Sequence, residues 1–312
     1  MTTSVAVALY NGERFLYKQL ESLRTQTKAP DQVVFCDDGS KDDTVAIVRD
    51  YIAKYQLHDK WVLVENENNL GYARNFYKAM SLCDADLVFL ADQDDIWKQD
   101  KIEKMAAVME SHPEIALLSC KFEIIDGNDQ VMHGVLARPQ KESFEVKAVT
   151  TVDLLRGFTW LGMLMCVRNT FAKQLLPKVM DFPIAHDRVL SHCAADLGLF
   201  FEYDYIGAYH RRHENNTAKE EHRISKLLNL NRKLQDIEVA KKLYSDMLSV
   251  GLPLKEHSTK LMQKRLILLE QRETALQEKS ISKIIKLYQD DHGILLRKYS
   301  FICDIWLTFF GK

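Results

Sequence analysis

The chain up to Asp94 alternates four short apolar runs with amphipathic stretches, and a polar cluster follows each apolar run. The apolar runs are 4–9, 32–36, 61–65 and 86–91, and the stretches between them carry apolar residues near helical spacing. This alternation is typical of βα units joined into a parallel sheet. The sequence therefore predicts an α/β fold with a mostly parallel sheet flanked by helices.

The four polar clusters are expected to meet at one edge of that sheet. In order along the chain they are YNGE, DDGSKDD, NENNLGYARN and DQDD. Ligands of open α/β sheets bind outside the carboxyl ends of the strands. Four consecutive polar strand ends therefore indicate a binding site at this edge.

DQDD (92–95) constrains the chemistry most. Asp92 and Asp94 follow a fully apolar strand, where an unpaired carboxylate is costly and adjacent carboxylates repel each other. A divalent cation would remove the repulsion, and oxygen ligands favour Mg²⁺ or Mn²⁺, which take further ligands from substrate phosphates. A solvated loop is the alternative. DDGS (37–40) similarly reads either as a turn that caps the next helix or as a nucleotide contact.

The rest of the chain predicts a second region of different character. Residues 126–150 read as a loop-rich insertion, 160–167 as a strand, 186–198 as a helix and 199–213 as a strand or strand pair. Beyond 217 glycine and proline are scarce and Leu, Lys, Glu and Arg dominate, which predicts helices. We therefore divide the chain into 1–217, with halves 1–110 and 111–217, and a helical extension 218–312.

Composition excludes several classes of protein. The chain has 312 residues and a formal net charge of -2, so overall electrostatics give no support to nucleic-acid binding. No segment approaches the roughly 18 apolar residues that cross a bilayer, and the N-terminus lacks the basic region of a signal peptide. Six scattered cysteines fit a reducing compartment. We expect a cytoplasmic protein, peripheral on the inner face of the membrane if it meets one.

Four segments carry a resemblance to a known family. They are VALYNGERFLYKQLESLRTQT, VVFCDDGSKDDT, NLGYARNF and FLADQDDIWKQDKI. Their order and spacing resemble those of family 2 glycosyltransferases, enzymes with the GT-A fold. The resemblance covers 1–110 closely and, through HDRVL and YHRRHENN, extends more loosely to 217. It implies a nucleotide-sugar site in 1–110 and an acceptor side in 111–217.

Donor-binding roles follow from the resemblance residue by residue. Tyr10 and Asp38 match the residues that hold the base and ribose of a nucleotide sugar, although Ala8 stands where the family often has Thr or Ser. Arg74 matches an arginine near the donor, with a helix-surface arginine as the alternative. Asp92 and Asp94 match the D-x-D pair: Asp94 as metal ligand, Asp92 as a ribose or water-mediated contact.

The remaining roles lie in 111–217. Asp187 matches the family's general base; from sequence alone it is a carboxylate favoured at a helix N-terminus. His213 matches a histidine near the metal and diphosphate, although His210 stands where relatives tend to have Tyr. Trp160 is an acceptor-side candidate whose ring suits the C–H face of a pyranose, and a core tryptophan is the alternative.

Together these roles imply an inverting transfer that depends on Mg²⁺ or Mn²⁺, from a nucleotide-diphosphate sugar to a hydroxyl of a glycan or lipid-linked glycan. The form DQDDIW, the length and the helical extension resemble bacterial rhamnosyl- and hexosyltransferases of surface-polysaccharide synthesis. This slightly favours dTDP-rhamnose over a UDP-hexose. A nucleotidyltransferase and a non-catalytic nucleotide-sugar or glycan-binding module are the alternatives.

The segment 281–312 bears on the partners of the chain. It combines basic residues with large apolar ones, namely Lys283, Lys286, Arg297 and Lys298 with Phe301, Trp306, Phe309 and Phe310. Such a segment can lie at a membrane surface, where basic residues meet anionic lipid. It can equally pack on the catalytic domain or form a homodimer through the C-terminal helices.

Overall fold

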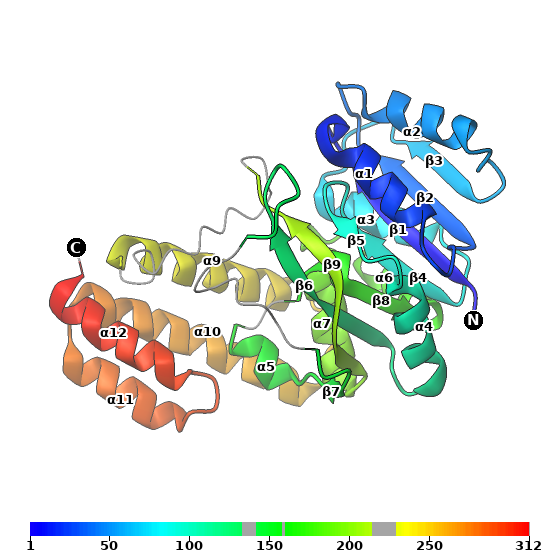
Figure 1. Ribbon diagram of the computed structural model, residues 1–312. Helices are drawn as coiled ribbons and strands as arrows, with labels where there is room; N and C mark the ends of the chain where they lie inside the picture. The colour runs from blue at the N-terminus through cyan, green and yellow to red at the C-terminus, as the bar shows by residue number, and fades with distance from the viewer. Residues whose placement is uncertain (133–141, 158–159, 214–228, 312) are drawn as a thin grey trace. The chain divides into compact units, whose positions relative to one another are not determined.

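The computed structural model describes residues 1–132, 142–157, 160–213 and 229–311 (Figure 1). The chain divides into two compact units. The first unit combines Met1–Val149 with Trp160–Asn216, and the second combines Thr150–Thr159 with Thr217–Lys312. The predicted division between 217 and 218 lies outside the described residues and stays a prediction.

A nine-stranded mixed sheet of described residues forms the first unit, in the order β3-β2-β1-β4-β8-β6-β9-β5, with β7 paired to β9. The strands are β1 (Thr3–Leu9), β2 (Gln32–Asp37), β3 (Trp61–Glu65), β4 (Leu87–Ala91), β5 (Ile96–Trp97), β6 (Leu117–Ile125), β7 (Val146–Ala148), β8 (Met165–Arg168) and β9 (Phe200–Arg211). The predicted α/β class is confirmed.

Strand direction decides which loops meet. Strands β1 to β4 run parallel, and β8 runs antiparallel to both β4 and β6. Strand β6 therefore returns to the direction of β4, and β9 is parallel to β6. The carboxyl ends of β1, β2, β4, β6 and β9 consequently lie at the same edge of the sheet.

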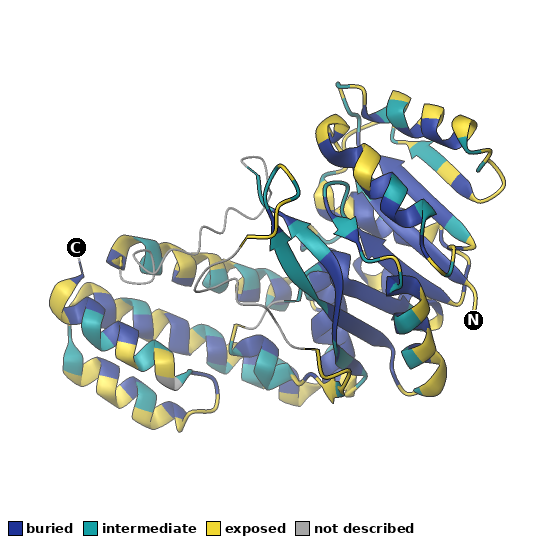
Figure 2. Ribbon diagram, viewed as in Figure 1, coloured by how far each residue is buried: buried dark blue, intermediate teal, exposed yellow. Residues whose placement is uncertain are grey.

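Helices cover both faces of the sheet (Figure 1). They are α1 (Glu13–Arg24), α2 (Thr44–Lys54), α3 (Tyr72–Ser81), α4 (Lys101–Ser111), α6 (Asn169–Val179) and α7 (His186–Leu197). Alternate strand residues such as Val5, Val7 and Phe35 join the apolar sides of α1, α2 and α4 in one core. Helix α3 packs on β1 and β2. Burial concentrates in the strands (Figure 2).

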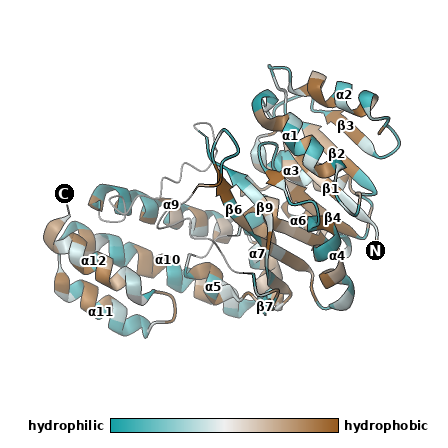
Figure 3. Cartoon of the chain, viewed as in Figure 1, coloured by the Kyte–Doolittle hydropathy of each residue, from teal (hydrophilic) through white to brown (hydrophobic). Residues whose placement is uncertain are grey.

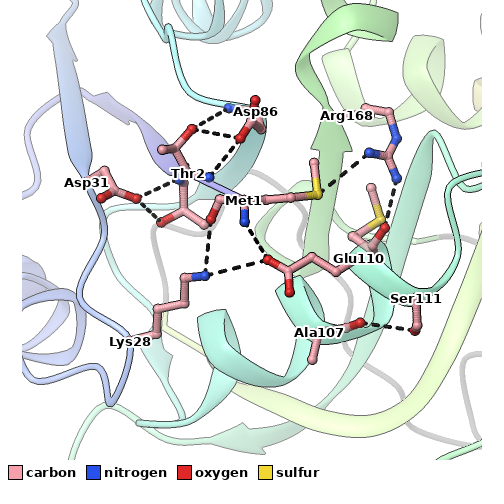
Figure 4. Close-up of polar contacts among 11 residues, drawn as sticks. Met1, Thr2, Lys28, Asp31, Asp86, Ala107, Glu110, Ser111 and Arg168 are labelled. Carbon is pink, nitrogen blue, oxygen red and sulfur yellow. Dashed lines mark hydrogen bonds and ion pairs between the residues drawn. The ribbon is translucent and has the colours of Figure 1, made fainter.

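The amino edge of the sheet is closed by contacts within the protein (Figure 4). The Asp86 carboxylate accepts from the Thr2 N–H at 2.8 Å, and the Asp31 carboxylate accepts from the Thr3 N–H at 2.8 Å. The terminal ammonium of Met1 pairs with Glu110. These polar groups at the amino edge therefore have partners within the protein.

The second unit is helical. Its elements are α5 (Thr151–Leu155), α9 (Leu230–Ser249), α10 (Glu256–Gln277), α11 (Ile281–Asp291) and α12 (Lys298–Phe310). Helix α10 contacts all four of the others. Apolar and polar residues alternate along these helices (Figure 3). The interior of the unit also contains charged side chains. Arg272 and Asp304 form a buried two-point ion pair, with N–O distances of 2.6 and 2.8 Å.

Several local expectations differ from the structure. Strand β7 lies within segment 126–150, which was expected to be loop-rich, and helix α5 follows that segment directly. Segment 160–167 begins with a 3₁₀ turn (Gly162–Leu164), and only Met165–Arg168 is strand. Segment 199–213 contains one long strand, β9, whose pairing with β5, β6 and β7 no local pattern reveals. Helix α6 and the two-residue strand β5 were not expected.

Within the described ranges, every helix is too short or too polar to cross a lipid bilayer. All six cysteines are buried and free of disulfides.

Candidate active site

The loops after β1 and β2 are tied together at the carboxyl edge. The Asn11 N–H donates to Ser40 Oγ at 2.9 Å, and the Lys41 N–H donates to Asn11 Oδ1 at 2.8 Å. Asn11 has a φ of 48°, a left-handed conformation that asparagine tolerates. Tyr10, a predicted donor contact, remains 50% exposed beside these bonds. The backbone is thus held while the phenol ring is open to solvent.

A side-chain amide links the β1 loop to the acidic loop after β4. Gln93 Oε1 accepts from the Tyr10 N–H, and Gln93 Nε2 donates to the Tyr10 carbonyl, both at 2.9 Å. The amide lies so close to Gly12 that a Cβ on this glycine would be 2.4 Å from Gln93 Oε1. Gln93 has no local sequence signal, because its partner is the main chain of a residue far away in sequence.

The Asp38 side chain is hydrogen-bonded to the loop after β3. Its carboxylate accepts from the N–H groups of Leu70 and Gly71 at 2.7 and 2.9 Å and from Asn66 Nδ2 at 2.9 Å. The residue is only 3% exposed. Three of the roughly four acceptor positions of a carboxylate are therefore used within the protein.

The acidic loop meets the end of β9, as the strand directions require. His213 Nε2 lies 2.8 Å from Asp94 Oδ2. His210 Nδ1 lies 3.0 Å from Asp95 Oδ1, which also accepts from the Arg211 N–H at 2.8 Å. Each of the two neighbouring aspartates thus has its own histidine. The two predicted metal ligands, 119 positions apart in sequence, are in contact.

Arg211 fixes the main chain of the acidic loop. It is fully buried, and its Nε donates to the Asp94 carbonyl at 2.8 Å. Its guanidinium lies over the Phe15 ring, 4.6 Å from the centroid, and pairs with Asp129. The sequence holds no local signal for this role, because the partners Asp94, Phe15 and Asp129 are far from Arg211 along the chain.

Negative charge is crowded at Asp92. Burial raises the pKa of its carboxyl well above the usual range, and the neighbouring carboxylates of Asp95, Asp94 and Asp187 raise it further. Burial also raises the pKa of Asp95. Because the charge of Asp187 affects the pKa of Asp92, the predicted base and the acidic loop belong to the same site.

Asp187 lies in the first turn of α7 and is 8% exposed. Its Oδ1 accepts from the Arg188 N–H at 2.7 Å, and the helix N-terminus favours a carboxylate there. His186, just before it, is fully buried and stacks on Phe76 with 3.9 Å between ring centroids. Burial lowers the pKa of His186 to about 4, so the imidazole is neutral at neutral pH.

Arg74 and Trp160 contact residues outside the group formed by the acidic loop, His213 and Asp187. Arg74 on α3 is exposed, and its guanidinium donates to the Asp181 carbonyl at 2.9 and 3.3 Å. Trp160 Nε1 donates to Glu202 at 2.6 Å, and the indole meets Phe200 edge-on at 5.3 Å. Their predicted roles at the donor and the acceptor stay predictions.

The chemistry of a divalent cation fits Asp94 and His213. Across residues 1–132, 142–157, 160–213 and 229–311 no group of three or more His, Cys, Asp and Glu side chains is arranged to hold a metal. Mg²⁺ and Mn²⁺, however, need only one or two protein ligands when phosphates and water complete the shell. The excess of carboxylates around Asp92 also favours a cation here.

Comparison with known proteins shows the family of the chain. The profile of Glycosyl transferase family 2 matches residues 4–162, about half of the chain. An uncharacterized glycosyltransferase of Nostoc sp. is 28% identical over 227 residues, which are 69% of this chain and 66% of the relative. The amylovoran biosynthesis glycosyltransferase AmsE of Erwinia amylovora is 34% identical over 116 residues, 36% of this chain and 42% of the relative. The matches thus span two thirds or less of these relatives.

A solved structure shows the same fold. The S. aureus TarS fragment 1–349 in complex with UDP-GlcNAc has a TM-score of 0.60 and 19% identity over 93% of this chain and 81% of that one. The fold is therefore the expected GT-A fold.

Proposed function

Because the chain belongs to glycosyl transferase family 2, we propose that it transfers a sugar from a nucleotide-diphosphate sugar to a hydroxyl of a glycan or lipid-linked glycan. The observation that carries the proposal is the meeting of Asp94 with His213, next to Asp92 and within reach of the charge of Asp187. The relative AmsE, named for amylovoran biosynthesis, supports a role in bacterial surface-polysaccharide synthesis.

The donor is bound across the ends of β1, β2 and β4 in this proposal. Tyr10 offers an exposed ring to the base, and Asp38 contributes its remaining acceptor position and the loop 66–71 that it orders. Arg74 lies near the diphosphate. The first donor to test is dTDP-rhamnose, followed by UDP-hexoses, among them UDP-GlcNAc because TarS was solved with it.

Asp94 and His213 would hold the cation, Mg²⁺ or Mn²⁺. When bound, such an ion neutralises the diphosphate and stabilises it as a leaving group. Asp92 contacts the ribose directly or through water. Arg211 keeps the Asp94 main chain in place through its 2.8 Å bond to the carbonyl, so the ligand position does not depend on the cation.

Asp187 is the general base. Its carboxylate accepts the proton of the acceptor hydroxyl as that oxygen forms a bond to the sugar C1. The bond between C1 and the diphosphate oxygen breaks in the same step, the electron pair leaves with the diphosphate, and the configuration at C1 inverts. Asp187 lies in the first turn of α7, so the helix fixes the position of the carboxylate.

The C-terminal helices provide the proposed contact with a membrane or a second copy. Helix α12 exposes Tyr299, Ile302, Phe309 and Phe310 by 61–65%, and these lie on one side at helical spacing. Apolar aromatic faces of this kind bind interfaces. We assign the protein to the cytoplasmic side of the cell membrane, with a homodimer through these helices as the other arrangement.

The deciding experiment is a thermal-shift screen of nucleotide sugars with Mn²⁺, with Mg²⁺ and with chelator. We expect one donor to raise the melting temperature only when a cation is present, and to be turned over with an acceptor. A shift without transfer or hydrolysis would favour the non-catalytic binding module. A nucleotidyltransferase would instead consume a nucleoside triphosphate and a sugar phosphate; no shift with any nucleotide sugar would reject the proposed function.

A further inference from the structure

Tyr72 presents an exposed aromatic ring beside the candidate base. It is the first residue of α3, and its side chain is 43% exposed. One part of its ring contacts Phe76 edge-on at 5.4 Å, and another meets His186 at 5.5 Å between centroids. His186 directly precedes Asp187 in the chain. The ring is therefore fixed by the helix that carries Asp187 while remaining open to solvent.

The aromatic cluster of Tyr72, Phe76 and His186 is tightly packed at its base. His186 stacks on Phe76 at 3.9 Å, with the ring planes 25° apart. A Cβ on Gly162 would lie 2.3 Å from His186 Nε2, so glycine is needed there. The neutral imidazole and Phe76 cannot rotate freely in this packing. The Tyr72 ring therefore packs against two rings, Phe76 and His186, that are themselves held rigidly.

The phenol group of Tyr72 lies within electrostatic range of two carboxylates. Although 43% of the residue is exposed, the atoms packed around it remove enough water to raise its pKa above the usual value, and the charges of Asp92 and Asp187 raise the pKa further. The hydroxyl therefore stays protonated and can donate a hydrogen bond. The phenol is thus influenced both by the acidic loop, assigned above to the donor, and by Asp187, assigned above to the acceptor.

A rigid, uncharged ring with a polar tip has the chemistry of a sugar contact. The C–H face of a pyranose packs on an aromatic face, and the phenol can bond a ring hydroxyl. The nucleotide contacts Tyr10 and Asp38 follow β1 and β2, whereas Tyr72 is anchored to α7. We propose that Tyr72 binds the pyranose ring of the acceptor and so determines which hydroxyl meets Asp187. This inference rests on the proposed function and names the acceptor contact of that site.

Trp160, the aromatic residue predicted for this role from sequence, differs in its surroundings. Its indole N–H donates to Glu202, and its ring meets Phe200. Neither contact belongs to the aromatic cluster. Tyr72 lies within NLGYARNF, two positions before Arg74, and is proposed in addition to Trp160.

The test is saturation-transfer NMR on the full chain with methyl pyranosides as probes, namely the rhamnoside, glucoside, galactoside and N-acetylglucosaminide, with and without UDP. We expect ring protons of at least one probe to be saturated. Tyr72→Ala and Tyr72→Leu should weaken its binding about fivefold, whereas Tyr72→Phe should keep most of it. Tyr17→Ala is the matched control, because Tyr17 on α1 is similarly exposed at 47%.

The outcomes separate this inference from the proposed function. Equal saturation in wild type and Tyr72→Ala, or no saturated probe at all, would overturn the role of Tyr72. Melting temperatures measured on every variant exclude unfolding as the cause of lost binding. Failure of the proposed function would appear independently, as the absence of any cation-dependent shift with nucleotide sugars while pyranoside binding still depended on Tyr72.

Discussion

The side-chain amide of Gln93 pairs with the main chain of Tyr10 as a neighbouring strand would, through one accepted and one donated bond of 2.9 Å. Strands β1 and β4 diverge beyond Val7 and Ala91, their last paired residues, and this amide continues the pairing into the loops. The position of the exposed Tyr10 ring relative to the acidic loop is set by this link. The order of the proposed donor site therefore depends on a residue to which the sequence assigned no role.

Gly12→Ala should disturb this link. The added Cβ would lie 2.4 Å from Gln93 Oε1, and the amide would have to leave Tyr10. We expect a loss of roughly 1–3 kcal/mol in unfolding free energy, the usual cost of overpacking, and weaker donor binding in calorimetry. Gly127→Ala is the control, because its Cβ would meet Arg14 at an ordinary 3.7 Å. Equal stability of the two variants would argue against a fixed Gln93 amide.

Asp94→Ala should remove the cation dependence of donor binding. The reason is that Asp94 is the carboxylate in contact with His213 and carries most of the proposed cation site. His213→Ala should weaken the dependence to a lesser degree, because phosphate and water can replace one neutral ligand. Calorimetric titrations of the donor with Mn²⁺ and with chelator measure both. Asp59→Ala, a loss of charge at an exposed position, serves as control; unchanged cation dependence in Asp94→Ala would reject the assignment.

Asp187→Asn should abolish transfer and spare donor binding. The amide keeps the shape of the carboxylate but cannot accept a proton at neutral pH, and general-base catalysis contributes about 10²–10⁴-fold. Initial rates of transfer and the donor-induced thermal shift are the two measurements. A variant that turns over at near wild-type rate would show that another group takes the proton.

Acid should destabilise the first unit through His186. Its pKa is about 4 in the folded protein and 6.5 without burial, so the unfolded chain binds the proton first. Stability present above pH 6.5 is lost as the pH falls toward 4, by roughly 2–4 kcal/mol from this group. Urea unfolding across this range should show a smaller loss in His186→Leu. Removal of the exposed His58 should leave the loss as it is in wild type.

Asp304→Ala should destabilise the helical unit. The substitution leaves Arg272 buried without its carboxylate, which costs roughly 3–5 kcal/mol. The double variant Arg272→Met/Asp304→Leu removes both charges and should recover most of the loss. Chemical denaturation followed by circular dichroism distinguishes the two. A double variant as unstable as the single one would mean that the ion pair itself, and not the stranded charge, matters.

The first half of the fold could be predicted because its signals are local. Each strand from β1 to β4 is a short apolar run followed by an amphipathic helix, and the polar clusters mark the strand ends. The direction of β8 carries no such signal, since an antiparallel strand of four residues reads like any apolar run. Strand β9 looked like one strand or two because only its pairing with three distant strands defines it.

The residues of the candidate site also divide into those with a local sequence signal and those without one. Asp94 is a candidate because a carboxylate directly after a buried apolar strand has few structural explanations. Asp187 became one only through the family resemblance, because a carboxylate at a helix start has an ordinary structural role. Gln93, Arg211 and Tyr72 were not candidates, because their contacts are with residues far away in sequence: the Tyr10 main chain, the Asp94 carbonyl and the ring of His186. Asp38 was also a candidate, but its three bonds to the loop after β3 were not foreseeable.

The chain enters the helical unit early and leaves it again before completing the sheet, because Thr150–Thr159 belongs with the C-terminal helices. Helix α5 is held there by the bond from Tyr244 Oη to the Leu154 carbonyl and by those from Arg156 to the carbonyls of Gly293 and Ile294. A single cleavage after the sheet would thus give a nicked but associated protein, not two free pieces. Removing the C-terminal helices would leave α5 without its partners, so this protein resists dissection at one linker.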